Sequence, residues 1–191
     1  MTEKNPEPRG VPPSRPLPSQ IMHLLELTRL DANDAGKIIG IAPNAIMGWM
    51  TFNAGDTMPP AHWLLLNVYT LAVRNICWPE ATEDYIRDRF PGAFPDEIAP
   101  KRKYAIPEGP PLPSPDAIID LLYDADTTLD DTAFVPKRTA DSWLGPDKRR
   151  MPYAVYELTV MTLWARKICP PTGEMAEYIL QKYNGMFNPD R

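Results

Sequence analysis

The residues of this chain best suited to chemistry are basic side chains gathered in one short stretch of its second half. Lys137 and Arg138 begin an expected helix, and Lys148, Arg149 and Arg150 follow after it. Side chains of this type bind phosphate groups, because each base that contacts a polyanion releases condensed counterions. In a chain whose formal net charge is -5, this cluster therefore predicts a local binding site for a polyanion.

Other kinds of chemistry have little support in the sequence. Neither histidine, His23 or His62, has a nucleophile or a base at the spacing of a catalytic set. The glycines are scattered singly, so the sequence predicts no phosphate-binding loop. Cys77 and Cys169, with two dispersed histidines, give no metal-ligand spacing. We therefore expect no catalytic residues, no cofactor, no metal and no small-molecule substrate.

In the first half, the stretch LDANDAGKIIGIAPNAIMGWM predicts two short helices joined by a tight turn. Asp31 can cap a helix that ends at Ile39, and Gly40 then allows the turn. Pro43 begins the second helix, which carries Trp49 on its inner face. A short helix, a glycine turn and a second short helix form the helix-turn-helix pattern.

The chain repeats this pattern after a proline-rich segment. The phrase PLPS occurs at 16–19 and at 111–114, each time before an apolar helical pattern that Ser19 or Ser114 can cap. TLAVRNICWP and TLWARKICPP share their arginine and cysteine, and the halves close with YIRDRFPGAF and YILQKYNGMF. Trp49 corresponds to Trp143 in this register. The sequence therefore looks like two copies of one helical unit.

We predict an all-α fold of two tandem helix-turn-helix domains related by internal duplication, each with about five helices. The expected boundaries are a disordered proline-rich tail over 1–16, a first domain over 17–99, a proline-rich linker over 100–111 and a second domain over 112–191. Trp49 and Trp143 should be largely buried at equivalent positions. The second motif lacks the turn glycine and about one helical turn.

In its first motif the chain resembles the Cro/XRE-like family of helix-turn-helix proteins. The family phrase is matched without a gap by Leu30, Ala35, Gly36, Gly40, Ile41, Ile46 and Trp49. Gly55 and Pro59 also fit the family, whereas Met50 replaces its common acidic residue. The resemblance implies a sequence-specific DNA-binding protein that regulates transcription, for instance as a repressor in a phage, plasmid or integrated element.

The resemblance also implies that the second helix of each motif faces the bases of double-stranded DNA. In the second half we expect this helix from about Lys137 to Leu144, and its candidate contacts are Lys137, Arg138, Thr139 and Ser142. In the first half Asn44 is the candidate, because asparagine can pair with adenine. Candidate phosphate contacts are Lys148, Arg149 and Arg150 after the helix, and Lys101, Arg102 and Lys103 in the linker.

Proteins of this family usually bind as dimers, so a duplicated chain could supply both halves of one site. At about 3.1 Å per residue the linker reaches roughly 37 Å, and successive major grooves lie about 34 Å apart. The site would then be asymmetric, with Lys137 and Arg138 in one half and Asn44 in the other.

A protein partner is the alternative. Met47, Met50 and Phe52 surround the second helix of the first motif, either as core residues or as an apolar docking face. On the second view the chain is a non-enzymatic binding module for a host factor or inhibition target, or a homodimer through its first domain. No apolar run approaches the roughly 18 residues of a membrane span, so we expect a cytoplasmic protein with reduced cysteines and no membrane contact.

Overall fold

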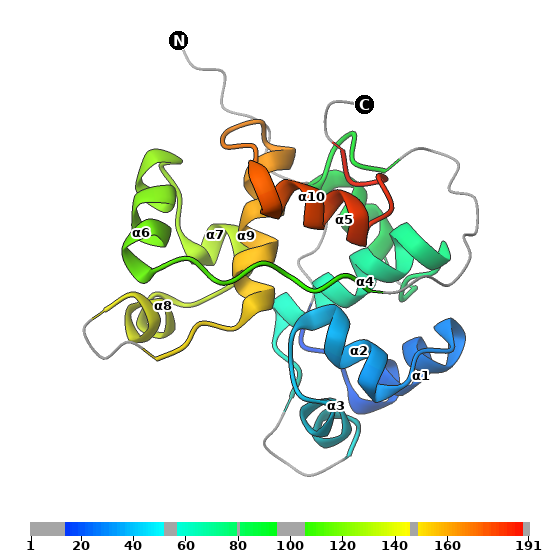
Figure 1. Ribbon diagram of the computed structural model, residues 1–191. Coiled ribbons are helices and arrows are strands. Elements are labelled where there is room, and N and C mark those ends of the chain that lie inside the picture. Colours follow the sequence, from blue (N-terminus) through cyan, green and yellow to red (C-terminus); the bar gives the residue numbers. More distant parts are fainter. Residues whose placement is uncertain (1–13, 52–56, 80, 95–105, 146–148, 189–191) are drawn as a thin grey trace.

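The computed structural model describes residues 14–51, 57–79, 81–94, 106–145 and 149–188, and all secondary structure in them is α-helical (Figure 1). The first series of helices is α1 (Pro18–Thr28), α2 (Ala32–Ile39), α3 (Pro43–Met50), α4 (Pro60–Arg74) and α5 (Thr82–Arg89). The second series is α6 (Pro115–Asp124), α7 (Leu129–Ala133), α8 (Lys137–Leu144), α9 (Tyr153–Ala165) and α10 (Gly173–Lys182). The predicted all-α class is confirmed. None of these described helices is long and apolar enough to cross a membrane.

Of the two serines predicted to cap the first helix of each series, one does so. Ser114 accepts a hydrogen bond from the backbone N–H of Ala117 at 3.2 Å and caps α6. The prediction for Ser19 is wrong, because α1 already begins at Pro18, with Leu17 as its capping residue. There the side-chain oxygen of Gln20 accepts a hydrogen bond from the Leu17 N–H at 2.7 Å. It thereby satisfies one of the backbone N–H groups that have no partner within the helix at its start.

The first four helices of each series share a pattern of contacts. In the first, α1 and α2 each contact α3, and α2 contacts α4; in the second, α6 and α7 contact α8, and α7 contacts α9. The two central helices, α4 and α9, hold equivalent places and pack against each other (Figure 1). Contact between equivalent helices is what a twofold relation of two duplicated units would give.

The backbone also repeats its uncommon left-handed conformations. Each such residue of the first series has a counterpart at the same place in the second, and Asn184 is one more in the second. The pairs are Arg29 with Asp126, Gly40 with Phe134, Asn75 with Lys167, Ala81 with Gly173, and Gly92 with Gly185. Because residues other than glycine seldom adopt this conformation, its repetition supports the proposed internal duplication.

The halves share a continuous hydrophobic core in which their closing phrases meet. The ring of Phe187 lies 5.3 Å from that of Phe90 and 6.4 Å from that of Phe94. Tyr69 and Tyr183 approach to 6.3 Å across the same contact. Each such aromatic pair contributes about 0.5–1.5 kcal/mol beyond the area that it buries. The packing of the halves, and not the reach of the linker, therefore fixes their separation.

Residues 95–105, the start of the predicted linker included, lie outside the described part. Its end packs against the second half: a Cβ at Gly109 would lie 2.6 Å from the hydroxyl oxygen of Tyr153, at the start of α9. The backbone at Gly40, in the turn of the first motif, also packs against Tyr153. At the other end of the chain, Pro16 of the predicted tail is buried.

A buried cation from each half reaches a helix of the other half. Lys182, the last residue of α10, donates to the carbonyl oxygen of Ile38 in α2. Arg89, the last residue of α5, donates to the carbonyl oxygen of Thr132 in α7. The acceptors correspond, because each lies two residues before the left-handed residue that ends its helix. We call these residues the crossed cations; each binds where the helix dipole is negative.

The first of the crossed cations has a buried carboxylate beside it. The Lys182 ammonium lies 2.7 Å from the Glu157 carboxylate of α9, and both side chains are fully buried. The hydroxyl groups of Tyr178 and Tyr183 donate to the same carboxylate at 3.4 Å and 2.8 Å. Burial lowers the pKa of Lys182, and the Glu157 carboxylate opposes that shift. This network links α9 and α10 to α2.

The second cation, Arg89, has no ion pair with a described residue, although the nearby Asp131 carboxylate opposes the lowering of its pKa. The Arg89 guanidinium lies 4.6 Å over the ring of Phe134, and it donates to the hydroxyl groups of Tyr85 at 3.3 Å and Thr162 at 3.4 Å. Burial lowers the pKa of Arg89. Because guanidinium is more weakly hydrated than ammonium and stacks on aromatic rings, arginine suits this environment.

Replacing Lys182 with methionine tests the first crossed cation. The variant leaves the Glu157 carboxylate buried without its cation, so we expect the free energy of unfolding to fall by about 3–5 kcal/mol. Urea denaturation followed by tryptophan fluorescence measures this. The double variant Glu157→Leu/Lys182→Met removes both charges and should recover much of the loss.

Lys37→Met, at an exposed lysine of α2, is the control for loss of a lysine charge and should change stability by less than about 0.5 kcal/mol. A Lys182→Met variant as stable as the wild type would show that the crossed cation does not hold the halves together.

Candidate nucleic-acid interface

In the first half, α2 and α3 form the predicted helix-turn-helix. Asp31 caps α2 by accepting from the N–H of Asp34 at 2.8 Å. Gly40 ends α2 with a φ of 70°, and the N–H of Ile41 donates back to the carbonyl oxygen of Gly36 at 2.9 Å. A Cβ at Gly36 would lie 2.6 Å from the Ile41 carbonyl oxygen. The turn therefore approaches α2 so closely that Gly36 cannot carry a side chain without a shift of the backbone.

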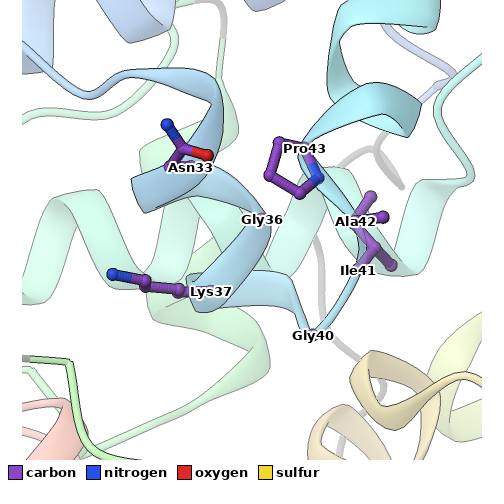
Figure 2. Close-up of a pocket in the computed structure, with 7 residues that line it drawn as sticks. All are labelled: Asn33, Gly36, Lys37, Gly40, Ile41, Ala42 and Pro43. Atoms are coloured by element: carbon purple, nitrogen blue, oxygen red, sulfur yellow. The ribbon is translucent and has the colours of Figure 1, made fainter.

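A shallow depression lies at this turn (Figure 2). Its lining residues come from α2, the turn and the start of α3: Asn33, Gly36, Lys37, Gly40, Ile41, Ala42 and Pro43. Asn33 and Lys37 are exposed one turn apart on α2, and Asn44 is exposed at the second position of α3, as predicted. Sequence reasoning missed Asn33 and Lys37, although their i, i+4 spacing places them on one helix face.

The inner side of α3 holds Ile46, which is fully buried, and Trp49. Trp49 and Trp143 occupy the same, seventh, position of α3 and α8, as predicted. Both pack against the core with a minor part of the side chain exposed, which agrees with the prediction that they are largely buried. Both helices are short and lie at the edge of the molecule, which leaves part of each indole in solvent. Trp49 packs edge-on against His62 of α4 at 5.7 Å.

The exposed side of α3 carries an apolar group where a DNA-reading helix often has a polar one. Met47 is 51% exposed, whereas Met50 is half-buried against the core. Phe52 lies outside the described residues. Of the three residues proposed for an apolar docking face, Met47 is therefore the one that the structure shows to be exposed to solvent.

In the second half, α7 and α8 form the corresponding pair. α7 has 5 residues where α2 has 8, which confirms the predicted loss of about one turn. Phe134 takes the place of the turn glycine and adopts a left-handed φ of 58°. Thr128 caps α7 by accepting from the N–H of Asp131 at 3.2 Å. α8 spans Lys137–Leu144, as predicted.

Four of the predicted basic residues, those that the structure describes, lie on an open edge formed by α8. Every residue of α8 is at least partly exposed, and Lys137, Arg138 and Thr139 are exposed in its first turn. The positive end of a helix dipole is at its N-terminus, so two basic side chains there do not stabilise the helix. The stability of α8 therefore gives no reason for their placement.

Arg149 is hydrogen-bonded to α8. The N–H of Arg149 donates to the carbonyl oxygen of Ser142 at 3.0 Å, which sets Arg149 and Arg150, both exposed, at the end of α8. The Ser142 hydroxyl donates to the Thr139 carbonyl oxygen at 2.7 Å, so its hydrogen already binds within α8. Basic groups thus lie at both ends of one exposed helix. Lys148, Lys101, Arg102 and Lys103 are outside the described residues.

Both cysteines are free and half-buried. The Cys77 thiol follows α4, and burial raises its pKa to about 12. A thiol is nucleophilic as its thiolate, so Cys77 fits a packing role and not a reactive one.

Comparison of the chain with models of protein families, with curated proteins and with solved structures gives no match. The family resemblance of the first motif therefore stays a prediction, and the function is inferred from the geometry.

The close approach at Gly36 gives a test of the first motif. Gly36→Ala should lower the free energy of unfolding, because the new Cβ collides with a backbone oxygen that moves only with the turn. Gly48→Ala in α3 is the matched control. A Cβ there meets no described atom within 4 Å, and alanine favours a helix interior over glycine by about 0.5–1 kcal/mol.

Thermal or urea unfolding of both variants should therefore show changes of opposite sign. Equal stabilisation by the two alanines would mean that the turn does not contact α2 as described.

Acid should weaken the contact between α3 and α4 through His62. Burial lowers the pKa of His62 from 6.5 to about 4. The unfolded state then binds the proton more tightly than the folded state, so stability falls as the pH decreases from about 6.5 to 4. Between pH 7 and pH 5, wild type should lose about 2 kcal/mol more than His62→Leu.

Urea unfolding at the two pH values measures this difference. His23→Leu, at the exposed histidine of α1, is the control and should keep the acid sensitivity of wild type. If His62→Leu loses as much stability as wild type, His62 does not resist protonation in the folded protein.

Proposed function

We propose that this chain is a sequence-specific binder of duplex DNA and a transcriptional regulator, with α8 making its main contacts. The observation that best supports this is the exposure of Lys137 and Arg138 in the first turn of a helix at the edge of the molecule, with Arg149 and Arg150 at its other end. An α-helix fits the major groove, and the start of a recognition helix is the part that usually meets base edges.

The chemistry of the side chains indicates which residues contact bases and which contact phosphates. Arg138 can pair with a guanine through two hydrogen bonds, which distinguishes one base from another. Arg149 and Arg150, beyond the end of α8, suit contacts to phosphates, which position the protein without reading the sequence. A net charge of -5 opposes binding elsewhere on the surface, so affinity should depend strongly on this edge.

The biological setting rests on the resemblance of the first motif. We propose a regulator, such as a repressor, of a phage, plasmid or integrated element, which acts in the cytoplasm where that DNA lies. No part of this proposal requires catalysis, a metal or a cofactor.

The second candidate is a protein-binding module built on the same scaffold. The observation that favours it is Met47, which is 51% exposed on α3. Such a protein would leave DNA unretarded and would form a complex of defined stoichiometry with one partner, or with a second copy of itself through α3.

Electrophoretic mobility shift with the full chain and short genomic duplexes tests the proposal. Arg149→Gln/Arg150→Gln should weaken binding to all sequences and lower the slope of log K against log salt by about 1.8, or about 0.9 for each phosphate that the protein no longer neutralises. Arg138→Ala should weaken the preferred duplex by about 1–3 kcal/mol and relax its sequence preference.

The matched control is Arg29→Gln/Lys167→Gln, which removes two exposed charges at the ends of α1 and α9. It should leave the salt slope of the preferred duplex unchanged. The assignment of the site to α8 fails if this control and the Arg149/Arg150 variant behave alike, and the proposed function fails if the wild type retards no duplex.

A further inference from the structure

We infer that one chain reads an asymmetric duplex site, with an A·T half under α3 and a G·C half under α8. This rests on the proposed function and deepens it, because it states which bases each motif distinguishes. Three features of the described residues support it: the arrangement of the motifs, the rigid contact between the halves, and the side chains at matching positions of the two helices.

Both second helices lie on the outside of the molecule, away from the contact between α4 and α9. Figure 1 shows α8 at the lower left and α3 at the bottom. Two helix-turn-helix motifs with an approximate twofold relation present their second helices to neighbouring major grooves. Here one chain supplies both motifs, so a single molecule can cover the two grooves.

The contact between the halves keeps the two helices at a fixed separation. Lys182 joins α10 to α2 and Arg89 joins α5 to α7, so each cation ties the first helix of one motif to the other half. Buried groups of this kind do not rearrange freely, because a separated cation would be left without its acceptors. The spacing of the half-sites is therefore set by the fold.

The α8 half carries groups that suit a G·C pair. Arg138 and Asp141 occupy the second and fifth positions of α8, and both are exposed. Their i, i+3 spacing puts them on one helix face. Arginine pairs with guanine O6 and N7, and aspartate accepts from the cytosine amino group.

The α3 half carries groups that suit an A·T pair at the same two positions. Asn44 and Met47 are the second and fifth residues of α3, and both are exposed. Asparagine pairs with adenine N6 and N7, and an apolar side chain contacts the thymine methyl group. Asn33 and Lys37, exposed on α2 beside this helix, provide donors for phosphates. Met47 is therefore a base-reading group on this view.

Selection from a random 30-base-pair duplex library with the full chain tests the inference. We expect enrichment of a bipartite site whose halves lie about 10 base pairs apart, with conserved G·C pairs in one half and A·T pairs in the other. Sedimentation of the complex should give one chain per duplex.

Two variants assign the halves to the helices. Arg138→Ala should erase the preference for guanine in one half and weaken the selected duplex about 5- to 150-fold. Asn44→Ala should erase the preference for adenine in the other half and leave the G·C half unchanged. The affected residues are exposed in the free protein, and circular dichroism checks that both variants fold.

The outcomes separate the two proposals. A single enriched half, two chains per duplex, or an unchanged selected site with Asn44→Ala/Met47→Ala would overturn this inference while DNA binding stands. The absence of any enriched or retarded duplex would overturn the proposed function itself, and this inference with it.

Discussion

The structure depends on two buried cations that cross between its halves. Removing an ammonium group from water costs several kcal/mol unless hydrogen bonds and an opposite charge compensate. For Lys182 that compensation comes from Glu157 and the Tyr178 hydroxyl of its own half and from the Ile38 carbonyl oxygen of the other half. Each cation therefore has acceptors in both halves, and each helix-turn-helix motif accepts a hydrogen bond from a cation of the other half.

The crossed cations occupy equivalent positions, but different groups compensate for the loss of their hydration. Lys182 lies beside a carboxylate of α9, whereas at the matching part of α4 the chain is a run of leucines. Arg89 instead uses backbone carbonyl oxygens, hydroxyl groups and the ring of Phe134, which occupies the place of Gly40 in the other motif. If the halves descend from one unit, these differences show how each contact could change while its position stayed the same.

The features that could be predicted from the sequence are those that short-range chemistry determines. The cap at Asp31, the turn at Gly40 and the limits of α8 follow from residue types within a few positions of one another. The contact between the halves could not be predicted in this way, because Glu157 lies within an otherwise apolar helix and its partner is distant in the chain. One signal was nevertheless present: in YIRDRF and YILQKY, Arg89 and Lys182 stand at the same place.

Under the proposed function, fusion of two motifs in one chain removes a constraint that symmetric dimers obey. In a homodimer both reading helices have the same sequence, so the two halves of a site must be alike. In this chain Asn44 corresponds to Arg138 and Met47 to Asp141, which are different chemical groups at equal positions. The half that contains α8 can then supply most of the phosphate contacts. The half that contains α3 distinguishes between bases but adds little electrostatic attraction to DNA. On this account an acidic chain can bind DNA through one local basic edge. Because the contact between the halves is rigid, binding of α8 to the duplex also brings α3 close to it.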